Sequence, residues 1–96
     1  LPRYPSIDRD LSPVVDESVT WDAIRHVIEA NDPDLLESVE YVTVYRGKPI
    51  PKGRKSVTLR MRFRDPDRTL KHEEVTEQIQ GVVKALSDSL NAEIRD

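Results

Sequence analysis

The chain has no cysteine among its 96 residues, and aromatic residues make up only 5% of it. The absence of cysteine excludes disulfide bonds, thiolate metal sites and a cysteine nucleophile. No apolar run approaches the roughly 18 residues of a membrane-spanning helix, and no basic start followed by an apolar segment marks a signal peptide. With 36% hydrophobic residues, the sequence predicts a small soluble cytoplasmic protein with a thin, periodic core.

Acidic residues are missing from one long segment of an otherwise acidic chain. The net charge is −3, yet residues 46–64 hold 8 basic side chains and no acidic one. Residues 1–45 carry a charge of −7 and residues 65–96 a charge of −4. Such a cationic segment is a candidate contact for a polyanion, the alternative being a solvated strand and loop.

The first six residues have the composition of an extended linker. Pro2 and Pro5 each fix φ and push the preceding residue toward extended conformations. The chain begins at Leu1 rather than at methionine. We therefore expect residues 1–6 to continue from a preceding part of a larger protein, and residues 7–96 to form one domain.

Periods of two and of 3.6 residues alternate along that domain. Thr20 is a suitable N-cap, and Asn31-Asp32-Pro33 is a helix stop. The expected elements are a strand at 9–16, a helix from Thr20 to Asn31, strands at 39–46 and 56–64, a helix at 72–90 and a short strand at 92–94. This βαββαβ order predicts an α+β fold, a ferredoxin-like two-layer sandwich with two helices on one face of a four-stranded antiparallel sheet.

The other face of such a sheet is open, and alternation predicts which side chains line it. The predicted open-face residues are Tyr41, Thr43, Tyr45 and the even-numbered residues of 56–64. Those predicted to meet the helices are Val42, Val44, Leu59 and Phe63, and Trp21 is assigned to the core. Aromatic rings among arginines suit single-stranded RNA, because bases stack and phosphates are neutralised. Cross-strand packing that only stabilises the sheet is the alternative.

The sequence lacks the residues that several other functions of a small ferredoxin-like fold require. An acylphosphatase needs a phosphate-binding loop after the first strand, but Asp16-Glu17-Ser18 is acidic and lacks glycine. His26 and His72 are expected on separate helices without the ligand spacing of a metal site. The signature of an RNA-recognition motif is absent from residues 56–64. A protein-interaction or effector-binding module of the same fold remains an alternative.

Several motifs occur in a family order along nearly the whole chain. They are Tyr4-Pro5, Arg9-Asp10-Leu11, Val44-Tyr45-Arg46-Gly47, the run from Ile50 to Ser56, the run from Phe63 to Leu70, and Glu73-Glu74-Val75. This set resembles the C-terminal ferredoxin-fold anticodon-binding domain of the bacterial phenylalanine-tRNA ligase beta subunit.

The resemblance implies recognition of the phenylalanine tRNA anticodon by a domain that is itself non-catalytic. It further implies, as partners, the rest of the beta subunit and the alpha subunit, in an enzyme of two alpha and two beta subunits. No cofactor is expected in this domain, since ATP and Mg would be used elsewhere in the full enzyme. No membrane partner is expected.

The resemblance also implies roles for individual residues. Tyr45 matches the tyrosine that packs on the first anticodon base, and Ser56 matches a serine that contacts the anticodon. Thr43 replaces the family aspartate two residues before the tyrosine, and a hydroxyl is a weaker, uncharged acceptor. Lys71-His72 is a poorer helix start than the usual small or acidic cap. The expected phosphate contacts are Arg46, Lys48, Lys52, Arg54, Lys55 and Arg60.

Overall fold

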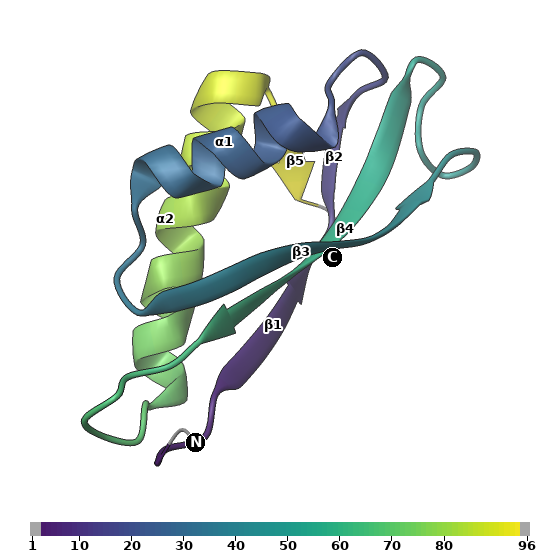
Figure 1. The fold of residues 1–96 in the computed structure, drawn as a ribbon. Coiled ribbons are helices and arrows are strands. Elements are labelled where there is room, and N and C mark those ends of the chain that lie inside the picture. The colour runs from purple at the N-terminus through teal and green to yellow at the C-terminus, as the bar shows by residue number, and fades with distance from the viewer. Residues whose placement is uncertain (1–2, 95–96) are drawn as a thin grey trace.

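In the computed structural model, which describes residues 3–94, five strands form one antiparallel sheet (Figure 1). The central strand is β4 (Arg54–Phe63). β1 (Ile7–Leu11) and β2 (Pro13–Asp16) pair with one edge of β4, β3 (Leu36–Tyr45) pairs with the other edge, and β5 (Glu93–Ile94) pairs with β2. Because β1 and β2 together occupy the place of one strand, the arrangement is the predicted ferredoxin-like fold.

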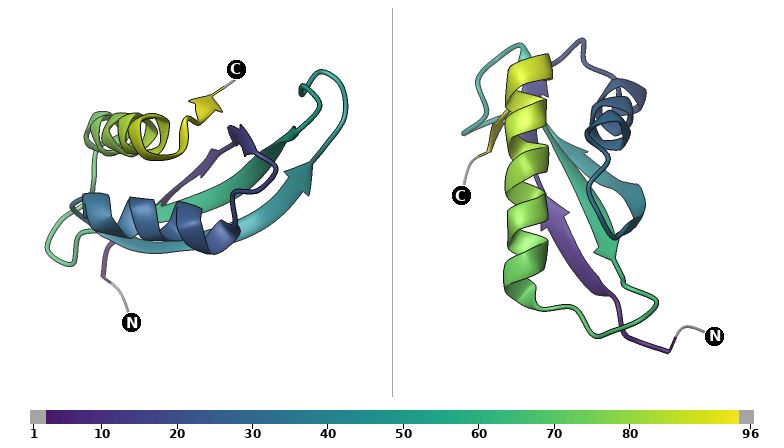
Figure 2. Two further views of the ribbon diagram at one scale, coloured as in Figure 1. Left: turned by 90° about the horizontal axis from the view of Figure 1, so that it is seen from above. Right: turned by 90° about the vertical axis from the view of Figure 1, so that its left-hand side faces the viewer.

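Both helices, α1 (Trp21–Asn31) and α2 (His72–Leu90), lie on the same face of the sheet (Figure 2). The Oγ1 atom of Thr20 accepts a hydrogen bond of 3.1 Å from the backbone N–H of Ala23, which confirms Thr20 as the N-cap. α1 ends at Asp32, whose φ of 47° is left-handed. The helix stop predicted at this position is therefore confirmed.

α2 begins without a capping side chain at Lys71, and Glu74 compensates for it. An oxygen of Glu74 accepts a 2.9 Å hydrogen bond from the backbone N–H of Lys71, which is one half of a capping box. Arg68 donates to the same carboxylate at 2.9 Å. These two hydrogen bonds, that of Arg68 first, lower the pKa of Glu74 to about 2.

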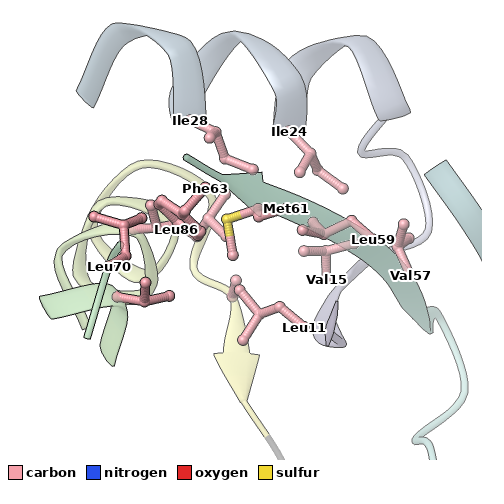
Figure 3. Close-up of a cluster of buried hydrophobic side chains, with 13 residues drawn as sticks. Leu11, Val15, Ile24, Ile28, Val57, Leu59, Met61, Phe63, Leu70 and Leu86 are labelled. Atoms are coloured by element: carbon pink, nitrogen blue, oxygen red, sulfur yellow. The ribbon is translucent and has the colours of Figure 1, made fainter. Parts of the chain in front are cut away.

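The core fills the space between the helices and the odd-numbered side chains of β4 (Figure 3). Leu59, Met61 and Phe63 are fully buried there, and Val57 is 3% exposed. Ile24 and Ile28 of α1 and Val75, Val82 and Leu86 of α2 cover them. The period-two pattern of β4 thus meets the apolar stripes of both helices, which is why the even-numbered residues of β4 face away from them.

The predicted boundaries differ from the observed ones mainly at strand ends. The helix expected at 72–90 is confirmed, whereas β3 starts three residues earlier and β4 two residues earlier than expected. The strand expected at 9–16 is broken at Ser12, next to Pro13, which has no N–H for the ladder. The Oγ atom of Ser12 instead lies 2.8 Å from Oγ1 of Thr58.

Candidate nucleic-acid interface

Three of the predicted contact residues meet on the face of the sheet that the helices leave open. Thr43 lies opposite Thr58, and Tyr45 lies opposite Ser56. Because directly opposed residues of an antiparallel pair project to the same side, and Val57 between Ser56 and Thr58 is buried in the core, all four project away from the helices. The open-face placement of Thr43, Tyr45 and Ser56 is therefore confirmed.

The prediction for Tyr41 and Val42 is wrong. Tyr41 lies opposite the buried Leu59, and its ring meets that of Trp21 edge-on with the centroids 5.9 Å apart. Tyr41 thus lies on the helix side, while Val42 is 40% exposed and does not enter the core. The ladder shifts register between Tyr41 and Thr43. This bulge inserts one extra residue and reverses the alternation, which a period-two pattern in the sequence does not reveal.

Tyr45 is the exposed aromatic residue at the hairpin end of the open face. It is 52% exposed, and its hydroxyl donates a 2.5 Å hydrogen bond to the backbone oxygen of Lys48. Gly47 lies between the two bonded residues in the chain, and its φ of 103° is in the left-handed region that favours glycine. The loop thereby fixes the ring through its hydroxyl and leaves half of the residue accessible for stacking.

The loop after Tyr45 is tied to the turn between β2 and α1. The guanidinium of Arg46 donates to both oxygens of Glu17, from Nε at 2.8 and 3.0 Å, and its Nη2 lies 2.6 Å from Oε1. The backbone N–H of Glu17 donates to the oxygen of Gly53 at 2.8 Å. The hydrogen bond with Arg46 lowers the pKa of Glu17 and raises that of Arg46. Arg46 is therefore held by a carboxylate.

Carboxylates of β1 hold two more arginines of the cationic segment. Asp10 lies opposite Arg60 and accepts hydrogen bonds from its Nε at 2.8 Å and from its Nη2 at 3.1 Å. Asp8 lies opposite Arg62 and accepts hydrogen bonds from Nε and Nη2 of Arg62 at 3.0 and 3.2 Å. Both pairs are two-pronged, the strong geometry for a guanidinium and a carboxylate. The hydrogen bond from Arg62 lowers the pKa of Asp8, and the one to Asp10 raises the pKa of Arg60.

The remaining cations of residues 46–64 fall into two groups. Arg54 donates to the backbone oxygens of Val14 and Asn91 at 2.9 and 3.0 Å, and Nε of Arg64 lies 3.4 Å from Oε1 of Glu37.

Within residues 3–94, by contrast, no carboxylate lies within 4 Å of the ammonium groups of three lysines, Lys48, Lys52 and Lys55. Lys48 and Lys52 are exposed in the loop, whereas Lys55 lies opposite the buried Val15 and so starts from the helix side.

Other kinds of site find little support in the part of the chain that the structure describes. That part contains no cluster of three or more side chains suited to hold a metal ion. Neither α1 nor α2 has the length and apolar character that crossing a membrane requires. A hollow of about 200 Å³ between the end of α1 and the start of β3 is lined by Glu29, Asp32 and Glu37 among others, at the opposite end of β3 from Tyr45.

Comparison with known proteins bears on this arrangement directly. Residues 2–95 match the model of the ferredoxin-fold anticodon binding domain. The chain belongs to this family. It is 43% identical over 95 residues to the phenylalanine–tRNA ligase beta subunit of Syntrophotalea carbinolica, and 41% and 38% identical to those of Halalkalibacterium halodurans and Clostridium acetobutylicum. These matches cover 99% of the chain, which spans about 12% of the length of each relative.

In this ferredoxin-fold anticodon-binding domain, the hairpin end of the open face combines an accessible ring, hydroxyl groups and lysines that have no carboxylate partner within residues 3–94. The structure brings Thr43, Tyr45 and Ser56 together and places Lys48 and Lys52 in the adjoining loop. It does not add Arg60 to that group as a free cation, since Asp10 already binds it.

Sequence reasoning missed the carboxylates that shape the interface. Asp8, Asp10 and Glu17 lie outside the cationic segment, 54, 50 and 29 residues from the arginines that they bind. The alternation of Asp8 and Asp10 with Ile7, Arg9 and Leu11 in the sequence was the available signal. Pairing those two positions with particular arginines required the register of β1 against β4.

Proposed function

We propose that the chain binds the anticodon of phenylalanine tRNA through the hairpin end of the open face. In this proposal Tyr45 stacks on an anticodon base, and Thr43 and Ser56 form hydrogen bonds with base edges. Basic side chains of residues 46–64 neutralise phosphates, which contributes affinity with little sequence information.

The observation that carries the proposal is the cross-strand pairing of Tyr45 with Ser56 beside Thr43. The family resemblance selects these residues by motif, and the register selects them independently by face. An aromatic residue that is 52% exposed and lies beside short hydroxyl side chains suits unstacked bases, which offer both a ring face and hydrogen-bonding edges.

For the whole protein, we propose the role that the relatives' name describes. The chain would be a non-catalytic domain of a phenylalanine–tRNA ligase beta subunit, acting in translation in the cytoplasm. Its partners would be the rest of that subunit and the alpha subunit, in an enzyme of two alpha and two beta subunits. ATP and Mg would be used elsewhere in that enzyme.

The test compares two tyrosines of one strand. A stacked base contributes about 1 to 3 kcal/mol, so Tyr45→Ala is expected to weaken binding of a phenylalanine anticodon stem-loop about tenfold or more. Tyr45→Phe keeps the ring and should lose less. Tyr41→Ala is the matched control, because Tyr41 is 47% exposed but lies opposite Leu59 on the helix side. Fluorescence anisotropy with a labelled stem-loop measures all three, beside a stem-loop with another anticodon.

Unchanged affinity for Tyr45→Ala would remove Tyr45 from the interface. An equal loss for Tyr41→Ala would place the RNA on the wrong face. A chain that is folded by circular dichroism but binds neither stem-loop at low salt would contradict RNA binding and favour a protein-interaction or effector-binding module.

A further inference from the structure

The open face has two halves with different electrostatics. At the hairpin end, Tyr45, Ser56, Thr43 and Thr58 carry no charge, and the adjoining loop supplies Lys48 and Lys52. At the other end, Arg60 and Arg62 lie opposite Asp10 and Asp8, so each guanidinium faces a carboxylate across the strands. The cations of the second half are therefore locally neutralised.

The geometry of these pairs determines what the arginines offer to an anion. Asp10 occupies Nε and Nη2 of Arg60 at 2.8 and 3.1 Å, which is one of the two forked pairs of donors that a guanidinium offers to a phosphate. A phosphate placed on Arg60 would also meet the negative charge of Asp10 at nearly the same distance, so attraction and repulsion largely cancel. Glu40, opposite Arg60 on the β3 side, adds a second carboxylate.

The same reasoning applies to the arginine nearest Tyr45. Glu17 binds Arg46 through both oxygens, while Arg54 is used by the backbone oxygens of Val14 and Asn91. Of the six cations expected to contact phosphates, Arg54, Lys48, Lys52 and Lys55 have no carboxylate within 4 Å in the described chain. Because Lys55 starts from the helix side and Arg54 is held by backbone oxygens, Lys48 and Lys52 are the cations that adjoin the open face without a partner carboxylate among residues 3–94.

We propose that Asp8 and Asp10 restrict RNA to the hairpin end of the open face, where about two phosphates are neutralised by Lys48 and Lys52 and not by the arginines. This inference rests on the proposed function and adds the extent of the RNA-binding surface. A short single-stranded loop fits on the hairpin end, whereas a long single strand is excluded from the β1 side. The carboxylates of β1 thus act as specificity determinants.

The salt dependence of binding measures the number of neutralised phosphates. For single strands, log K falls with log salt concentration with a slope of about −0.7 per phosphate. Two lysines predict a slope of about −1.4, whereas all six expected cations would produce about −4. The measurement uses the 96-residue chain and a phenylalanine anticodon stem-loop over a range of salt concentrations.

The variant Asp8→Asn/Asp10→Asn releases Arg62 and Arg60 for phosphates without removing either arginine. Its slope is expected to steepen to about −2.8, since two phosphates are added, and its affinity for poly(U) at low salt to rise at least about tenfold. The matched control is Asp22→Asn/Asp88→Asn. It changes the net charge equally and removes a carboxylate from Lys84 on α2 and from Arg25 on α1, where Glu29 still lies 3.6 Å from Arg25.

The control should keep a slope of about −1.4 and bind poly(U) only slightly more tightly. A wild-type slope of −4 or steeper, or equal changes in the two double variants, would overturn the inference while leaving anticodon binding intact. Absence of stem-loop binding by the folded wild-type chain at low salt would overturn the proposed function and this inference with it. Circular dichroism shows whether each variant is folded.

Discussion

Leu59→Ala should destabilise the domain strongly, whereas Val42→Ala on the neighbouring strand should hardly affect it. Leu59 is fully buried at the centre of β4, between Leu11 and Tyr41 on the flanking strands. Because strands on both sides and the helices above hold its neighbours in place, the cavity cannot collapse fully. The free energy of unfolding should fall by about 2 to 5 kcal/mol.

That loss is large against the total stability of about 5 to 14 kcal/mol for a domain of this length. The melting temperature should fall by at least about 8 °C, since each kcal/mol corresponds to about 4 to 8 °C. Val42 is 40% exposed at the bulge, so its truncation should cost no more than about 0.5 kcal/mol.

Urea unfolding measures both variants, with Trp21 as the probe. Trp21 is the only tryptophan of the chain, and its ring contacts that of Tyr41, so its emission reports on packing between α1 and β3. Far-UV circular dichroism provides a second probe of the same transition. A loss below about 1 kcal/mol for Leu59→Ala, or an equal loss for Val42→Ala, would refute the assignment of faces.

Two further predictions concern the helix starts. Glu74 has a pKa of about 2 in the folded state, below the ordinary value of 4.5, so its contribution to stability is present above about pH 4.5 and is lost as the pH falls toward 2. Glu74→Gln should therefore flatten the dependence of the urea midpoint on pH between these values. An unchanged pH profile would count against the capping role. Thr20→Ala removes the acceptor for the N–H of Ala23 and should cost about 1 kcal/mol in urea unfolding, while Thr20→Asp should restore most of it; equal stability of all three would show that α1 does not depend on this cap.

Local chemistry made most elements predictable. The apolar positions of α2, the alternation of β4 and the N-cap at Thr20 are properties of neighbouring residues, and the structure confirms each of them. Boundaries were less accurate where pairing, not propensity, sets the strand end. β3 extends back to Leu36 because Leu36 pairs with Phe63, a partner that no local pattern specifies.

The candidate interface was predictable to a smaller degree. The motif selected Thr43, Tyr45 and Ser56 as contact residues and the alternation placed them on the open face, but the alternation also placed Tyr41 there. One inserted residue at the bulge reversed the side on which Tyr41 lies. A pattern of period two contains no information on such an insertion unless the partner strand is known.

The sequence by itself determined the order of the elements, the core face of β4 and the position of the cationic segment, because periodicity and composition are local. Only the tertiary structure decided which of those cations are available. Asp10 and Asp8 come to lie against Arg60 and Arg62 by the register of β1 on β4, and Glu17 reaches Arg46 because two turns meet at one end of the sheet. Charge distribution in the chain follows from sequence, but charge neutralisation depends on contacts between distant residues.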